Sequence, residues 1–216
     1  MGGLKEFLSR FFSNKGHHVF FSFLIAKICG FLGSLVIIRL LPENEYGILS
    51  IVISVCAIFL PFSGFGSNQI LLRYGAISEK ENKQNLSSYL FFKGIFNEII
   101  LIVIFVGISL FYAPKYENII IIFLFFGNRL MGFYLSNHIQ TYYRISGKND
   151  IFAKVSNAIN IGGFILLLVL TYLFKFYGYL LAIALIPYLS LFWLKKEMFS
   201  AKRIVYDNKK EIWRFG

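Results

Sequence analysis

The sequence predicts an all-α transmembrane protein, a bundle of six membrane-spanning helices with both termini in the cytoplasm. The first indication is composition: 57% of residues are hydrophobic, 19% are aromatic and only 15% are charged. A typical soluble domain has about 25% charged residues. The second and third indications are six long apolar runs and the alternation of basic residues between them. The excess of apolar side chains, including 26 phenylalanines, is expected to face lipid.

Six runs are long enough to cross a bilayer, which takes about 20 apolar residues because about 30 Å of hydrocarbon is crossed at about 1.5 Å per residue. The expected spans are 17–41, 46–72, 88–112, 118–142, 153–174 and 176–194. The run 46–72 contains no charged residue. A soluble helical bundle, the alternative, would have charged outer faces, so this run favours lipid.

Basic residues indicate the orientation of the bundle. Lysine and arginine gather before the first span, after the second, after the fourth and after the sixth. The other three connections are poorer, with Arg39, Lys115 and Lys175. Cytoplasmic loops carry the excess of lysine and arginine, so both termini are expected to be cytoplasmic.

Two terminal segments flank the expected bundle of residues 17–194. Residues 1–16 place several apolar side chains on one helical face, which predicts an amphipathic helix on the membrane surface, with a frayed tail as the alternative. Residues 195–216 are basic and are expected to form a cytoplasmic tail or a linker to a further bundle.

Several function classes are excluded. The net charge of +11 does not indicate nucleic-acid binding, because the basic residues lie between apolar runs and not in one patch with aromatic side chains. Cys29 and Cys56 lie inside apolar runs and are expected to be small apolar residues. The three histidines form no H-E-x-x-H motif, and neither a P-loop nor a nucleophile elbow is present. We therefore expect no catalytic residue, metal site or cofactor, and no enzyme.

Four ionisable residues interrupt the spans: Lys27, Lys93, Glu98 and Arg129. Such groups are costly at membrane depth and usually mark a functional site. Lys93 and Glu98 are five residues apart and do not share a helix face, so Glu98 could pair with Lys27 or Arg129 as a structural ion pair. Even then, cations are in excess. This predicts a water-filled cationic cavity that favours a phosphate or diphosphate ligand.

Small and polar residues recur at helical spacing in four spans. The stripes comprise Lys27, Gly30 and Ser34; Ser50, Ser54, Ala57, Pro61, Gly64 and Asn68; Arg129, Gly132, Ser136, Gln140 and Tyr143; and Ser156, Asn160 and Gly163. Close helix packing is the alternative explanation for the small residues. Pro61 and Pro187 are expected to bend their helices.

Two stretches resemble a known family: "AKICGFLGSLVIIRLLPENEYGILSIVISV" and "GFGSNQILLRYGA". They are similar to bacterial polysaccharide-biosynthesis flippases of the O-antigen translocase type, within the multidrug/oligosaccharidyl-lipid/polysaccharide exporter superfamily. The family pattern is a glycine-bearing first helix, a turn into the second helix, and a glycine-rich end that runs into Arg-Tyr. The matching residues are Gly30, Gly33, Arg39, Leu40, Leu41, Pro42, Tyr46, Gly47, Gly64, Gly66, Arg73 and Tyr74.

This resemblance implies a MATE-like fold, in which two six-helix bundles surround a central cavity. It also implies translocation of undecaprenyl-diphosphate-linked oligosaccharide across the bacterial inner membrane, during synthesis of O-antigen, lipopolysaccharide or capsule. Lys27 matches a first-helix cation that faces the diphosphate in related flippases, and Arg129 is the second candidate contact. The remaining candidate substrate-binding residues are Lys93, Glu98, Asn97, Arg39 and Arg73.

Chain length departs from the family pattern, because family members are about twice as long. The chain is therefore expected to be an N-terminal half: a fragment that lacks a further bundle, the product of a disrupted gene, or a half-transporter that pairs with a second chain. Two other functions stay open. A multidrug or cation exporter would need an acidic cavity, for which Glu98 is the only acid near mid-membrane, and a scaffold subunit of polysaccharide assembly would need no cavity.

Overall fold

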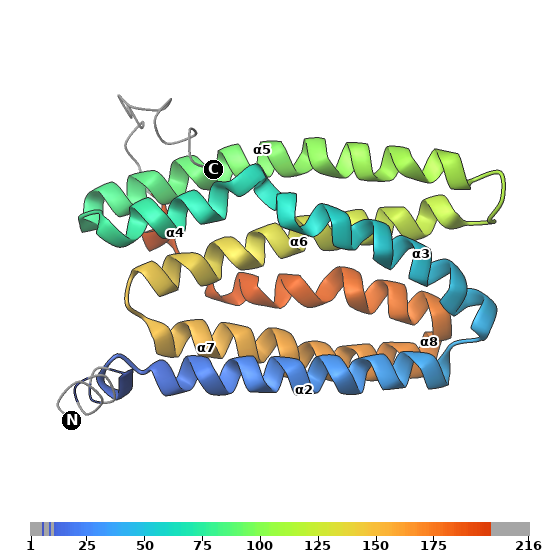
Figure 1. Ribbon diagram of the computed structural model, residues 1–216, viewed down its shortest axis with the longest axis horizontal. Helices are drawn as coiled ribbons and strands as arrows, with labels where there is room; N and C mark the ends of the chain where they lie inside the picture. Colours follow the sequence, from blue (N-terminus) through green and yellow to red (C-terminus); the bar gives the residue numbers. More distant parts are fainter. Residues whose placement is uncertain (1–5, 7–8, 10, 200–216) are drawn as a thin grey trace.

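The computed structural model describes residues 6, 9 and 11–199, and this part of the chain folds as an up-and-down helical bundle (Figure 1). The elements are α2 (Gly16–Leu40), α3 (Glu43–Phe59), η1 (Leu60–Gly66), α4 (Ser67–Ile77), α5 (Lys80–Tyr112), α6 (Ile119–Ile145), α7 (Asn149–Asn157), η2 (Ala158–Gly162), α8 (Gly163–Leu185), η3 (Ile186–Trp193) and η4 (Lys196–Met198). Within the described residues every regular element is helical, which confirms the predicted all-α class.

Five continuous helical segments are long and apolar enough to cross a membrane: Gly16–Leu40, Glu43–Ile77, Lys80–Tyr112, Ile119–Ile145 and Asn149–Trp193. The last has 45 residues. At about 1.5 Å per residue it is roughly twice as long as the hydrocarbon layer is thick. This segment therefore has to turn back on itself.

The turn lies at Lys175, whose backbone dihedrals are φ 52° and ψ −126°. After the turn, Gly178 packs against the backbone carbonyl of Leu170, where a larger residue would overlap. The chain then returns antiparallel through the end of α8 and η3 (Figure 1). The five segments thus provide the six predicted passes, and the protein is a multi-pass membrane protein.

Replacing Lys175 with glycine is expected to stabilise the protein. A side chain at this φ and ψ costs about 1–3 kcal/mol, and glycine adopts such a conformation without that penalty. Lys115, in another turn at the same end, has no positive φ. Thermal unfolding in detergent should therefore show a higher midpoint for Lys175→Gly and no gain for Lys115→Gly. Equal midpoints for the two variants would contradict the strained turn.

The second span is not one bent helix, as its proline had indicated, but two helices joined by an irregular segment. Pro61 lies at the start of η1, where its missing N–H removes a helical hydrogen bond. Ser63 is extended at ψ 126°, and Gly64 and Phe65 follow with positive φ of 62° and 46°. The break therefore leaves backbone N–H and C=O groups between α3 and α4 without helical hydrogen bonds.

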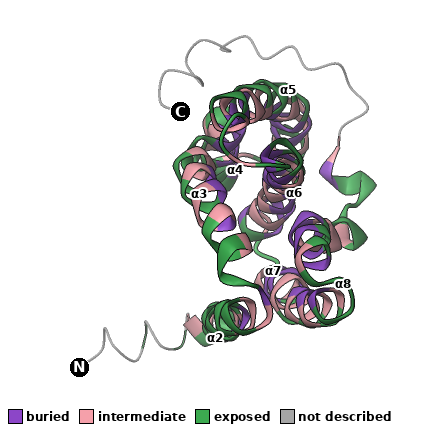
Figure 2. Cartoon of the chain, turned by 90° about the vertical axis from the view of Figure 1, so that its right-hand side faces the viewer, coloured by how far each residue is buried: buried purple, intermediate pink, exposed green. Residues whose placement is uncertain are grey.

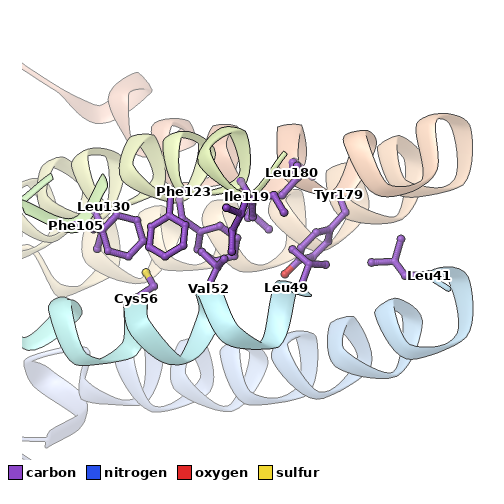
Figure 3. Close-up of a cluster of buried hydrophobic side chains, with 14 of the residues drawn as sticks. Leu41, Leu49, Val52, Cys56, Phe105, Ile119, Phe123, Leu130, Tyr179 and Leu180 are labelled. Carbon is purple, nitrogen blue, oxygen red and sulfur yellow. The ribbon is translucent and has the colours of Figure 1, made fainter. Parts of the chain in front are cut away.

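Aromatic and aliphatic side chains from α3, α5, α6 and α8 form the main core, in which Cys56, Phe105, Phe123 and Leu130 are fully or almost fully buried (Figure 3). Cys56 is thus a small core residue, as predicted. The periphery of the bundle is exposed and rich in large apolar side chains, as expected for a surface that faces lipid (Figure 2).

Basic residues gather at one end of the bundle, where α2 begins and α4 and α6 end (Figure 1). The residues at this end include Lys15, Arg73, Lys80, Lys83, Arg144, Lys148 and Lys154. Arg39, Lys115 and Lys175 lie at the other end. The positive-inside rule predicts that the first end is cytoplasmic. Half of the expected amphipathic segment 1–16 and most of the expected tail 195–216 fall outside the described residues.

Candidate functional site

A partly open cavity of about 450 Å³ lies between four passes: α2, α6, the α7–η2–α8 pass and the returning end of α8 with η3. Its lining combines apolar side chains with a set of polar ones. The polar lining residues are Ser34, Arg129, Ser136, Asn137, Gln140, Ser156, Asn160 and Tyr179. Arg129 is the one charged residue in this lining. The bundle therefore contains a polar, singly cationic hollow among membrane-spanning helices.

Helical periodicity places these residues on the cavity wall. On α6, Arg129, Ser136 and Gln140 recur at intervals of seven and four residues, so they share one helix face. Ser156 and Asn160 form the same kind of face across α7 and η2, where Asn160 donates to the carbonyl of Ser156 at 2.7 Å. The polar stripes of the sequence thus face a common space in three passes.

Glycines on α2 help to keep this space open. Gly30 and Gly33 line the cavity. A Cβ atom built on either would have no heavy atom within 4 Å. Close packing of small residues, the alternative explanation for this stripe, does not apply at these two positions. Their missing side chains leave room beside Ser34.

Arg129 has no carboxylate partner within the described residues. The ion pairs recorded in this part of the chain join Lys15 to Asp150 at 3.3 Å and Lys148 to Glu197 at 3.5 Å, near the basic end. The Arg129 guanidinium carbon lies 5.7 Å from the centre of the Phe126 ring. Arg129 stands ten residues into α6, about 15 Å from its start, which is deep in the membrane. An unpaired guanidinium there can bind a phosphate group through several N–H donors.

Lys27 and Lys93 do not share this cavity with Arg129. Both side chains are exposed, and neither residue lines the hollow. Lys27 lies one turn before Gly30 on the same stripe of α2, beside the cavity lining. Lys93 points its ammonium at Phe96 on its own helix, 5.2 Å from the ring centre. We expected three cations in the lining of one cavity, and of these only Arg129 lies there.

The other predicted contacts are also separate from the cavity. Arg39 is exposed at the end of α2, and Arg73 is exposed on α4, with its guanidinium carbon 5.8 Å from the Tyr74 ring centre. Asn97 is half-buried on α5, which contributes no residue to the cavity. Of the seven predicted binding residues, only Arg129 lies in the cavity lining, where residues of the predicted polar stripes surround it.

Glu98 corrects a specific expectation. Its side chain is fully buried on α5, but it pairs with neither Lys27 nor Arg129. One carboxylate oxygen, Oε2, accepts hydrogen bonds from the Gly64 N–H at 2.6 Å and the Ser63 hydroxyl at 3.0 Å. The sequence could not show this partner, because the donors belong to the irregular segment η1.

A buried polar network lies next to Glu98, and sequence reasoning missed it. His138 is bonded through its two ring nitrogens to Asn68 at 3.2 Å and to Ser87 at 3.1 Å. The Tyr134 hydroxyl donates to the backbone carbonyls of Leu90 and Phe91 at 2.8 and 3.0 Å. These residues join α4, α5 and α6. They lie too far apart in the sequence for any spacing rule to link them.

Comparison with known proteins places this fold in a family. The family model described as "Polysaccharide biosynthesis protein" matches residues 16–202, which is most of the chain. The chain belongs to this polysaccharide biosynthesis family. The match covers the whole bundle, including the four passes that enclose the cavity. No curated protein and no solved structure matches the chain. As a member of this family, the protein has a role in polysaccharide biosynthesis, and it has that role as a multi-pass membrane protein.

Proposed function

We propose that this protein translocates an undecaprenyl-diphosphate-linked oligosaccharide across the bacterial cytoplasmic membrane. The observation that carries the proposal is the cavity at membrane depth, whose polar lining contains one unpaired arginine. A diphosphate is the anionic part of such a lipid, and Arg129 supplies the opposite charge in a low dielectric. The serine and amide side chains around it offer hydrogen bonds to phosphate oxygens and to sugar hydroxyls.

The chemistry of the cavity favours this cargo over a cationic drug. A cation exporter needs an acid in its cavity, and Glu98 is absent from the lining. Lys27, on the stripe that leads into the cavity, is proposed as a secondary contact for the diphosphate. One bundle provides one wall of an alternating-access pathway, so we propose that a further bundle or a second chain provides the other.

Deleting the gene in its native cell tests this function against a scaffold role. A flippase defect leaves synthesis of the lipid-linked oligosaccharide intact, so the precursor should accumulate on the cytoplasmic leaflet while the surface polysaccharide disappears. Extracted lipids and labelled surface polysaccharide provide the two measurements. Loss of the precursor together with the surface polysaccharide would indicate a scaffold for synthesis and would contradict translocation.

A further inference from the structure

Glu98 is a fully buried acid that the proposed transport mechanism leaves unused. Its exposed fraction is 0%, and it lies 18 residues into α5, near the middle of the span. Its oxygen Oε1 is buried and has no hydrogen-bond partner. A carboxylate in an apolar setting is costly unless it is paired, and it commonly becomes protonated instead. The structure therefore places an incompletely satisfied acid at membrane depth.

The groups around Glu98 provide no compensating positive charge. Cys56 of α3 and Tyr134 of α6 lie close enough to sense its charge, and neither is a cation. On α6, Arg129 acts on Cys56 and His138 is bonded to Asn68 and Ser87, but neither forms a hydrogen bond or an ion pair with Glu98. The segment η1 has no ionisable side chain, and the α4 residues Arg73 and Tyr74 lie near the far end of that helix. On α5 itself, Lys93 is exposed and turned toward Phe96. On η4, Lys196 and Glu197 precede Phe199, which contacts Phe91 and Phe92, about two turns from Glu98.

The two hydrogen bonds of Glu98 attach the irregular segment between α3 and α4 to α5. Both donors, the Ser63 hydroxyl and the Gly64 N–H, belong to the non-helical part of η1. Ser67, one turn further on, bonds back to the Gly64 carbonyl at 2.5 Å. Hydrogen bonds to an ionised carboxylate are about twice as strong as those to a neutral acceptor. The charge state of Glu98 therefore sets how tightly η1 is fastened to α5.

We propose that Glu98 is a proton-binding site that controls whether η1, the irregular segment between α3 and α4, is held against α5. When the carboxylate is ionised, it accepts the two hydrogen bonds and holds η1 against α5. When a proton binds at Oε1, the acid becomes neutral, the two hydrogen bonds weaken, and η1 is released. A proton fits this site better than a metal cation, because the described residues place no group of three or more acidic, histidine or cysteine side chains there to hold a metal. This assignment replaces the predicted role of Glu98 as a substrate contact, and it does not depend on what the cavity carries.

Amide hydrogen exchange of the purified protein in nanodiscs tests the site directly. The peptide that covers residues 60–67 should lose protection by about tenfold at acidic pH relative to alkaline pH, after correction for the intrinsic exchange rate. A peptide from the middle of α6 provides the internal reference. Glu98→Gln, which keeps the shape and removes the charge, should show low protection at both pH values. Glu117→Gln, on an exposed turn, is the matched control and should behave as the wild type.

The following outcomes would overturn the proposal. The first is wild-type protection of residues 60–67 that does not depend on pH. The second is a pH dependence that persists in Glu98→Gln. The third is a loss of protection caused by sodium ions at constant pH, which would assign a metal cation instead. Ser63→Ala keeps the acid and removes one donor, so it should lower protection at alkaline pH and reduce the response to pH. A full response in Ser63→Ala would also count against the proposal.

Discussion

Arg129→Ala is expected to abolish export of the surface polysaccharide while the lipid-linked precursor accumulates. Arg129 is the one charged residue in the cavity lining, and no acid in the described part of the chain neutralises it. Hydrogen bonds to charged groups contribute about 1.5–3 kcal/mol each, so loss of the guanidinium should weaken diphosphate binding by about 10- to 100-fold. Surface polysaccharide and extracted precursor in a complemented deletion strain provide the measurement.

Two further variants make the Arg129 result specific. Arg129→Lys keeps the charge and loses the planar fork of donors, so it should retain part of the activity. Lys27→Ala should cost less than Arg129→Ala, because Lys27 is exposed beside the cavity and does not line it. Export at the wild-type level in Arg129→Ala would contradict a role for this residue in binding the diphosphate.

Gly94→Ala is expected to destabilise the protein by about 1–3 kcal/mol, the usual cost of forcing an extra methyl group into a packed core. A Cβ atom at Gly94 would overlap the ring and hydroxyl of Tyr134. Tyr134 is fully buried, and it is held by hydrogen bonds to Leu90 and Phe91. The ring also lies against Gly64, so it has little room to move.

Gly107→Ala is the matched control on the same helix. A Cβ atom at Gly107 meets no heavy atom within 4 Å. The change should be neutral or stabilising by up to about 1 kcal/mol, because alanine is a better helix former than glycine. Unfolding by denaturing detergent in mixed micelles compares the two variants. Equal stability of Gly94→Ala and Gly107→Ala would contradict the close contact between α5 and Tyr134.

The spans could be predicted from the sequence, because an apolar run of sufficient length has few alternatives to crossing a membrane. The rotation of each helix was harder to predict. On α6, polar residues from Arg129 to Gln140 repeat with the helical period, so the face toward the cavity could be recognised. Most of α2 is apolar on every side, and periodicity therefore did not fix which way Lys27 points.

The surroundings of Glu98 could not be predicted for a different reason. Its partners are a backbone N–H and a hydroxyl in η1, which become available because the chain leaves the helical conformation after Pro61. Pro61 predicted a bend in this span. The proline gave no information on which neighbouring helix would form hydrogen bonds to the irregular segment η1. Side chain to backbone contacts between distant segments leave no pattern of spacing in one sequence.

Binding of a short prenyl diphosphate tests the central claim most directly. Isothermal titration of farnesyl diphosphate into the protein, held in nanodiscs of zwitterionic lipid, should show saturable binding that Arg129→Ala weakens by about 10- to 100-fold. Arg144→Ala, an exposed arginine on the same helix at the basic end, should leave the affinity unchanged. Equal affinity of the wild type and Arg129→Ala, or an equal loss in Arg144→Ala, would contradict a diphosphate site in the cavity.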